Sequence, residues 1–308
     1  MKKIIIILLI ILISVFAGLT LLDQGRYAME KKLWWAQKQY EQIARDPKAA
    51  PDQNYEDLVN QYRKIANQFP SAALTRKIYI KIGKVYLLKK DYVKARAAFQ
   101  ESMTRYPDDS VLHSEALMHM GSSFEIEAKY DEAKRTYQQI IEQYPLTDIG
   151  MSMPMYLITL NSKIGRPADA EKASLEALAF YEAIPKKDPE TKYAFAAQRM
   201  LAAVYFARGD TQKGINLLGQ MLTKYADKSE LMTPQQIVLI VKTINTMSVA
   251  NLKDYDTPIA IYQDFLNQNP RHQYGMYLQQ TINGLKELKE KNVGIRFQAV
   301  PQSQDAQR

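Results

Sequence analysis

Two stretches decide the fold: YIKIGKVYLLKKDYVKARAAFQESMTRYP at residues 79–107 and LMHMGSSFEIEAKYDEAKRTYQQIIEQYP at residues 117–145. Each has a glycine, an aromatic residue three positions later, an alanine nine positions beyond it, and a closing Tyr-Pro pair. The spacing is displaced by 38 residues throughout. A fixed displacement of this kind indicates a tandem repeat. The matching positions are Tyr79, Ile82, Gly83, Tyr86, Ala95, Phe99, Ser102 and Pro107, then Leu117, Met120, Gly121, Phe124, Ala133, Tyr137, Ile140 and Pro145.

The glycines of these stretches lie inside helical patterns, where glycine costs about 1 kcal/mol relative to alanine. We expect a compensating close approach of a partner helix, with Ala95 and Ala133 on the facing side. The prolines at the end of each stretch terminate the second helix. Each repeat therefore predicts an antiparallel pair of helices. Four extra residues at 108–111 are expected to lengthen the next helix by about one turn, with an aspartate or Ser110 as its cap.

Weaker copies extend the array over residues 33–270, in about six units of which two are strong. The weaker ones are recognised at residues 58–70, 154–177, 205–221 and 254–270. The flanking parts are predicted as a connecting helix with a proline-containing loop at 23–54, a capping helix at 271–292 and a flexible tail at 293–308. The whole pattern predicts an all-α solenoid of antiparallel helix pairs.

This pattern resembles the tetratricopeptide (TPR) repeat, which has the same order of large residue, helix glycine, aromatic residue, alanine and closing proline. The resemblance implies a superhelical solenoid. The resemblance also implies a concave groove, lined by the first helix of each repeat, that binds peptides of protein partners. The set that clamps a partner's terminal carboxylate in TPR co-chaperones is absent, because Ile80 and Met118 occupy its key places. The groove positions carried onto this chain include Lys77, Ile80, Lys84, Leu87, Leu88, Met118, Ser122, Glu125, Arg199 and Phe206.

An uncharged run at residues 4–22 follows Lys2 and Lys3. As a helix it would cover roughly 28 Å, close to the thickness of a bilayer core. We predict a transmembrane signal anchor at residues 1–22, with cleavage after Ala17 as the alternative. Trp34 and Trp35 follow at a distance; we expect them to pack on the first helix pair, and a position at the membrane interface is the alternative.

Positive charge is concentrated in one repeat. Residues 74–105 carry nine basic and two acidic side chains, or +7 of the chain's net +8. Three interpretations remain open for this basic repeat: a solvated surface, a docking face for an acidic protein or an anionic lipid or polymer, and a nucleic-acid site, which no accompanying motif supports. Lys77, Lys81 and Lys84 are the candidate docking residues.

Catalytic and metal-binding patterns are not found. The chain has no cysteine, and neither a phosphate-binding glycine loop nor a nucleophile elbow occurs in it. His113 and His119 are six residues apart and point to different faces of a helix, so they cannot share a metal ion. We therefore expect no cofactor, no metal and no enzymatic activity, and no nucleic-acid partner.

Aromatic-proline endings at residues 69–70, 106–107 and 144–145, with periods near 38, resemble periplasmic TPR proteins of the bacterial envelope. These are of the β-barrel assembly lipoprotein or Tol-Pal coordinator type. The resemblance implies a scaffold for protein partners in an envelope complex, for assembly, secretion or envelope coordination. We expect a single-pass protein of the bacterial inner membrane with its repeats in the periplasm, or a soluble periplasmic protein if the signal is cleaved.

Overall fold

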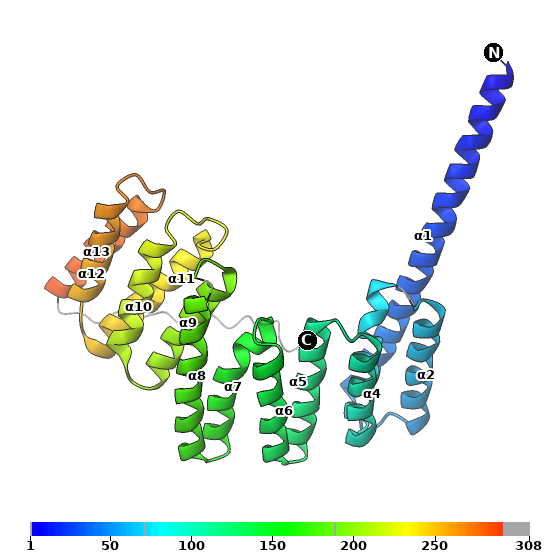
Figure 1. The fold of residues 1–308 in the computed structure, drawn as a ribbon, viewed down its shortest axis with the longest axis horizontal. Helices are drawn as coiled ribbons and strands as arrows, with labels where there is room; N and C mark the ends of the chain where they lie inside the picture. Colours follow the sequence, from blue (N-terminus) through cyan, green and yellow to red (C-terminus); the bar gives the residue numbers. More distant parts are fainter. Residues whose placement is uncertain (1, 71, 188, 292–308) are drawn as a thin grey trace. The chain divides into compact units, whose positions relative to one another are not determined.

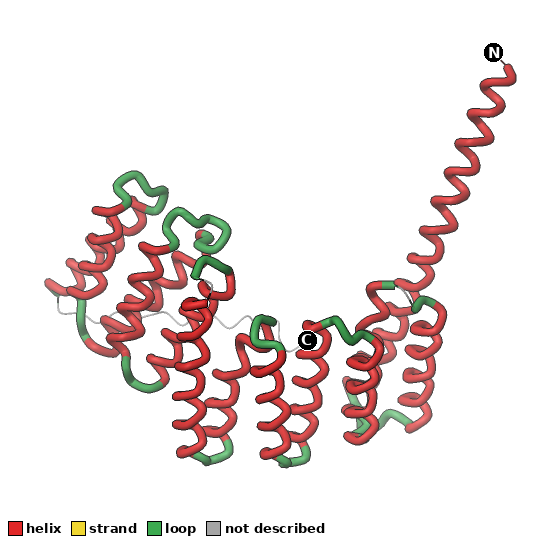
Figure 2. The backbone as a smooth tube through the Cα atoms, viewed as in Figure 1, coloured by secondary structure: helices red, strands yellow, loops and turns green. Residues whose placement is uncertain are grey.

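The computed structural model describes residues 2–70, 72–187 and 189–291, without the side chains of residues 2–11 and 15–24. Over these residues the chain is helical and contains no strand (Figures 1 and 2). The elements are α1 (Lys2–Arg45), α2 (Asp52–Gln68), the 3-10 helix η1 (Ala73–Lys77), α3 (Ile78–Leu88), α4 (Tyr92–Arg105), α5 (Ser110–Ile126), α6 (Tyr130–Gln143), α7 (Asp148–Lys163), α8 (Pro167–Lys187), α9 (Lys192–Ala207), α10 (Thr211–Lys224), α11 (Pro234–Asn245), the π-helix η2 (Thr246–Asn251), α12 (Asp256–Gln268) and α13 (Gly275–Glu290).

The chain divides into two compact units, Met1–Met153 and Pro154–Arg308, and the division falls within α7. In the first unit, successive helices pack side by side as α1 on α2, α3 on α4 and α5 on α6. Buried aromatic side chains such as Tyr62, Phe99 and Tyr137 fill the spaces between paired helices. The predicted all-α repeat of helix pairs is confirmed for this unit.

The second unit is built in the same way, with α9 packed against α8 and α10, and α12 against α10 and α13. Its core contains Tyr225, Tyr262 and Phe265. Pro154 lies inside α7, which begins at Asp148, so this helix starts earlier along the chain than the sequence pattern indicates.

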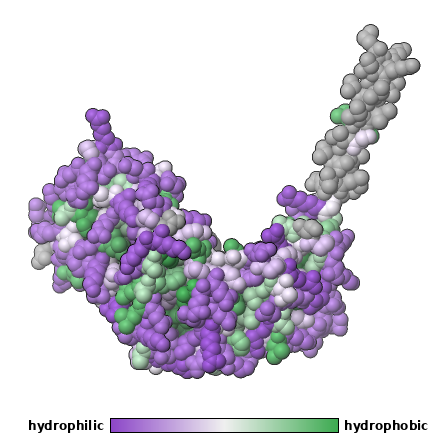
Figure 3. Space-filling view, in the orientation of Figure 1, coloured by the Kyte–Doolittle hydropathy of each residue, from purple (hydrophilic) through white to green (hydrophobic). Residues whose placement is uncertain are grey.

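Most of the surface visible in Figure 3 is hydrophilic, with small apolar areas between the polar ones.

The helix glycines of the first unit allow the predicted close approach, but the contacting group differs from the predicted one. A Cβ added at Gly83 would collide with the ring of Phe99, and one added at Gly121 would collide with the ring of Tyr137. Each glycine thus makes room for the aromatic ring on the second helix of its own repeat. At Gly83 the group that fills the space is Phe99 and not Ala95. Ala95 is fully buried elsewhere in the same interface.

A residue with a left-handed backbone conformation recurs in the turns between paired helices. Lys90 has a φ of 62° and Ala128, one period later, a φ of 58°. Gly209, at the matching turn of the second unit, has a φ of 83°. The left-handed residue reverses the chain within a short distance, so the second helix follows the first after a brief connection, such as residues 89–91 between α3 and α4.

Helix α1 contacts α2 through a stripe at seven-residue spacing, formed by Met29, Ala36 and Ile43. Trp34 and Trp35 lie off this stripe, and each is 52% exposed. The prediction that they pack on the first helix pair is therefore wrong. Their rings contact each other edge to face, with centroids 4.7 Å apart.

The anchor predicted at residues 1–22 lies almost entirely outside the residues whose side chains are described, and the tail at 293–308 lies outside the described residues altogether. No helix in the described part of the chain combines the length and apolar character that crossing a membrane requires.

Candidate functional site

An apolar groove of about 570 Å³ lies in the first unit between α1, η1 with α3, and the start of α5. Three large apolar side chains at its walls are exposed to solvent: Trp34 by 52%, Leu74 by 48% and Val111 by 60%. Each comes from a different helix pair. Exposed apolar side chains that converge on one hollow are typical of an interaction site, whereas single exposed ones are not. We call this hollow the unit-1 groove.

Local capping places the groove's walls. The side chain of Asp109 accepts a hydrogen bond from the backbone N–H of Leu112 at 3.0 Å and fixes the first turn of α5. Leu112 then turns into the core, while Val111 points outward. Asp109 is one of the caps that the sequence predicts. Leu74 lies in η1, where the hydroxyl of Thr75 donates to the carbonyl of Ala72 at 2.6 Å.

Lys81 supplies a cation to the groove. Its Nζ donates to Oε1 of Gln37 on α1 at 3.0 Å, and no ion pair forms with it among the described residues. Burial lowers the pKa of Lys81, and the neighbouring positive charge of Lys84 lowers it further. Glu115 acts in the opposite direction. The groove therefore combines apolar walls with a partly desolvated positive charge.

Most of the other cations in the basic repeat are already neutralised. Six of its nine basic side chains form ion pairs, several with carboxylates of the neighbouring helices. The pairs are Arg76 with Asp109, Lys77 with Glu115, Lys89 with Asp52 and Glu56, Lys94 with Asp91, Arg96 with Glu127, and Arg105 with Glu101. The positive charge that the sequence concentrates at residues 74–105 is thus balanced in part by carboxylates of the helices before and after this repeat.

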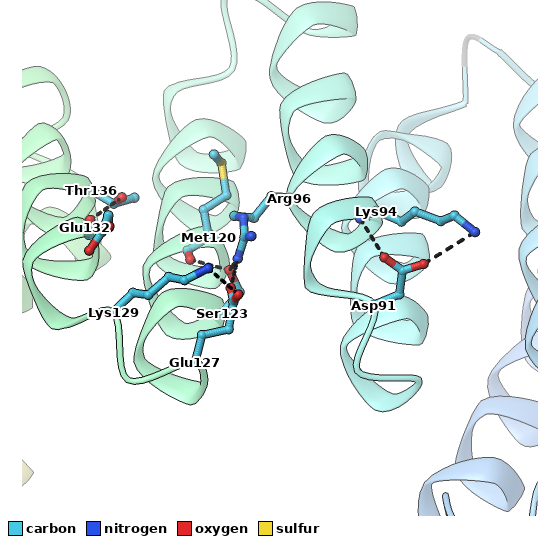
Figure 4. Close-up of polar contacts among 9 residues, drawn as sticks. All are labelled: Asp91, Lys94, Arg96, Met120, Ser123, Glu127, Lys129, Glu132 and Thr136. Carbon is cyan, nitrogen blue, oxygen red and sulfur yellow. Dashed lines mark hydrogen bonds and ion pairs between the residues drawn. The ribbon is translucent and has the colours of Figure 1, made fainter.

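Arg96 illustrates how such a cation becomes structural (Figure 4). From α4 its guanidinium group pairs with the carboxylate of Glu127 and donates to Oγ of Ser123 at 3.1 Å. The same group lies over the ring of Phe124, 4.3 Å from its centroid. Lys129 also pairs with Glu127, at 2.6 Å. This cluster ties α4 to α5, so Arg96 is not available to a partner.

The groove positions carried over from the TPR resemblance fall into different places. Lys77 lines the unit-1 groove, as does Lys81, which the sequence predicts as a docking residue of the basic repeat and not from the TPR resemblance. Ile80 is 1% exposed and belongs to the core, so its side chain cannot contact a partner. The hydroxyl of Tyr137 donates to Glu125. The remaining ones in this unit are partly buried along α3 and α5 and do not line the unit-1 groove: Lys84, Leu87, Leu88, Met118 and Ser122.

Arg199 and Phe206 belong to the second unit and meet in a separate hollow of about 300 Å³ between α9, α10 and α11. The sequence predicts the two as a pair of partner-binding positions, and the fold brings them to the same cavity. We call it the Arg199 pocket.

Two of the histidines hold helix ends in place. Nε2 of His113 lies 2.8 Å from the carbonyl of Tyr106, and its Nδ1 lies 2.8 Å from the hydroxyl of Tyr144. Because a carbonyl only accepts, Nε2 carries a proton, and in the neutral ring Nδ1 then accepts from the hydroxyl of Tyr144. His272 binds the carbonyl of Ala226 through Nε2 at 3.0 Å. Over the described part of the chain, no three acidic or histidine side chains gather as metal ligands would.

The sequence pattern does not identify three of the groove residues, Trp34, Leu74 and Val111. The available signal is that Leu74 and Val111 both stand at the start of the first helix of a repeat, about one period apart.

Comparison with known proteins gives one family match. Residues 79–109 and 115–147 match the tetratricopeptide repeat model. No curated protein matches the chain. Among solved structures, a thermophilic TPR protein of Thermus thermophilus is similar at 16% identity, with 69% of this chain and 100% of that one covered and a TM-score of 0.37.

Two further TPR structures are similar. YrrB, described as having an unusual peptide-binding site, shares 12% identity over 71% of this chain and 97% of its own, with a TM-score of 0.33. A protein of Parabacteroides merdae ATCC 43184 shares 9% identity over 86% and 99% of the two chains, with a TM-score of 0.33. The residues that match the tetratricopeptide repeat model cover nearly all of α3 and α4, most of α5, and α6, where the sequence pattern predicts the two strong repeats.

Proposed function

We propose that this chain is a non-enzymatic scaffold that binds a protein partner in the unit-1 groove. The observation that carries the proposal is the convergence of Trp34, Leu74 and Val111, each about half exposed, around the partly desolvated Lys81. Large aromatic and aliphatic side chains in a hollow with a polar rim are the usual anchors of protein interfaces. The tetratricopeptide repeats at residues 79–109 and 115–147 support the same function.

We further propose that residues 4–22 anchor the scaffold in the bacterial inner membrane and that the partner belongs to an envelope complex in the periplasm. The support is the uncharged run itself and the lysines that precede it. Deletion of residues 2–22 should move the chain from the carbonate-washed membrane fraction to the soluble fraction. A mature chain that begins after Ala17 would instead establish a cleaved signal and a soluble periplasmic protein.

Binding of an anionic lipid or polymer through the basic repeat receives less support. The ion pairs at six of its nine cations leave Lys81, Lys84 and Lys90 without a carboxylate partner among the described residues. Three lysines without a carboxylate partner give a weaker field than a stripe of nine. The unit-1 groove is therefore the stronger site.

Two charges in the groove should abolish partner binding. The double variant Leu74→Glu and Val111→Glu places carboxylates on the apolar walls, where a docked partner would have to desolvate them. Both side chains are exposed, so folding should be unaffected. We expect at least a tenfold loss of the partner that co-purifies with the tagged chain from detergent-solubilised membranes, measured by quantitative mass spectrometry.

The matched control is Val93→Glu. Val93 is 72% exposed on α4 and lies outside the groove, so this variant should recover the partner at the wild-type level. Partner recovery that is unchanged in the double variant, while both proteins keep the wild-type helical content, would refute the groove as the docking site.

A further inference from the structure

The Arg199 pocket has apolar walls and one cation. Arg199 and Phe206 of α9, Leu218 of α10 and Leu239 of α11 line it, and Leu239 is 47% exposed. The ring of Phe206 is held in place because Gly214 on α10 leaves the space it occupies: a Cβ at Gly214 would collide with that ring. The pocket is thus formed in advance by packing and does not depend on a loop.

The guanidinium group of Arg199 lies in the wall of this pocket. Among the described residues, none forms a hydrogen bond or an ion pair with it, although its side chain is partly buried. Burial lowers the pKa of Arg199, and no neighbouring carboxylate opposes the shift. A partly buried guanidinium group without an acceptor keeps only part of its hydrogen bonding to water, so a carboxylate that reaches it is stabilised more than at a fully exposed arginine.

The neighbouring arginine at the end of the same helix shows the contrast. Arg208 pairs with Glu171 at 2.8 Å and also hydrogen-bonds to Ser174. Its role is therefore a structural contact within the second unit. Arg199 has no such role, because its helix packs through Ala194, Ala197 and Leu201 on the other faces.

We propose that the Arg199 pocket binds an acidic side chain of a partner protein together with the apolar side chain next to it in that partner. The carboxylate would accept two N–H bonds from the guanidinium group, the arrangement in which this pair is strongest. The apolar side chain would cover Phe206 and Leu239. A volume of about 300 Å³ suits one carboxylate and one side chain of leucine or phenylalanine size.

The proposal commits to a glutamate or aspartate side chain within the partner. Arg199 is the one cation among the residues that line the pocket. A single guanidinium group satisfies one carboxylate, and no further donor of a side chain lines the cavity apart from Thr243. This site lies wholly within the second unit, so it stands independently of the unit-1 groove.

The test uses the full chain in detergent and four fluorescein-labelled nonapeptides, read by fluorescence anisotropy. The first carries a central Phe-Glu pair in an alanine and serine background and ends in an amide. In the second the glutamate is glutamine, in the third the phenylalanine is serine, and the fourth carries Phe-Gln and a free terminal carboxylate. We expect the first peptide to bind at least tenfold more tightly than the other three.

The protein variants locate the site. Arg199→Gln keeps the polarity of the side chain and should weaken the first peptide about tenfold or more, to the level of the glutamine peptide. Lys242→Gln removes the same charge from an exposed side chain of α11 outside the pocket and should leave binding unchanged. Leu74→Glu, in the other unit, should also leave it unchanged.

The proposal is overturned if Arg199→Gln binds the first peptide as wild type does, or if no peptide binds at millimolar concentration, on the order of the weakest affinities that anisotropy resolves. Preference for the free terminal carboxylate over the internal glutamate would equally overturn it, because the pocket would then read chain ends. Each of these results leaves partner capture by the unit-1 groove unaffected.

Discussion

Replacement of Gly83 by leucine is expected to lower the free energy of unfolding of the first unit by about 3 kcal/mol. The ring of Phe99 occupies the space of even a single added Cβ atom, and Phe99 is fully buried. The gain in helix propensity, about 1 kcal/mol, offsets only part of the overpacking. The measurement is the midpoint of urea unfolding followed by far-ultraviolet circular dichroism.

Gly284 supplies the same substitution without the collision. It lies in α13 with nothing within 4 Å of an added Cβ, so Gly284→Leu should leave the midpoint unchanged or raise it slightly. Shortening Phe99 to leucine in the Gly83→Ala background should recover part of the lost stability. Equal effects of leucine at positions 83 and 284 would contradict the packing described for α3 and α4.

Acid should destabilise the first unit through His119. Its ring stacks on Phe99 with centroids 5.4 Å apart, and its Nε2 is buried without a partner. Burial lowers the pKa of His119 to about 4, with Lys84 and Lys77 adding to the shift and Glu115 opposing it. An unfolded histidine has a pKa of about 6.5.

Between these two pKa values the unfolded chain binds a proton that the folded chain does not. The loss of folding stability caused by His119 is therefore absent above about pH 6.5 and grows as the pH falls toward 4. It reaches at most about 3 kcal/mol of lost stability, since each pKa unit corresponds to about 1.4 kcal/mol. Urea unfolding of wild type and His119→Phe should be compared across this range of pH.

His119→Phe keeps a ring against Phe99 but cannot be protonated. Carboxylates titrate in both proteins, so their effects largely cancel in the difference of unfolding free energies. That difference should shift in favour of the variant as the pH falls through the window. A difference that stays constant from neutral pH to the acid end of the window would show that the ring of His119 is open to solvent.

Periodicity predicts the helix pairs of the first unit because the repeat constrains backbone and core together. The spacing locates a tight helix contact at Gly83 but does not say which side chain fills the space. The ring of Phe99 fills it, because this side chain reaches across the interface and that of Ala95 is too short. Ile80 aligns with a groove position of the TPR repeat, but its side chain is buried in the core. A rotation of about 100° per residue separates core from groove on one helix.

The site was less predictable than the fold because it depends on proximity between repeats. Charge counted along the sequence ignores carboxylates contributed by other helices, such as Glu115 and Glu127, which neutralise cations of the basic repeat. Trp34 lies on the exposed side of α1 because a separate stripe of small and apolar residues takes the contact with α2. Lys81 and Arg199, which the sequence suggests as binding residues, each line a hollow of the fold, and their binding role stays a prediction.

Site-specific photo-crosslinking tests the central claim, that the unit-1 groove holds the partner, most directly. A benzophenone amino acid is placed at Val111 in the groove, or at Val93 on α4, which is similarly exposed and lies outside it. After irradiation of cells and detergent solubilisation, we expect a discrete protein adduct from position 111 and none from position 93. An adduct from position 93 with none from position 111 would place the partner on another face and contradict the account.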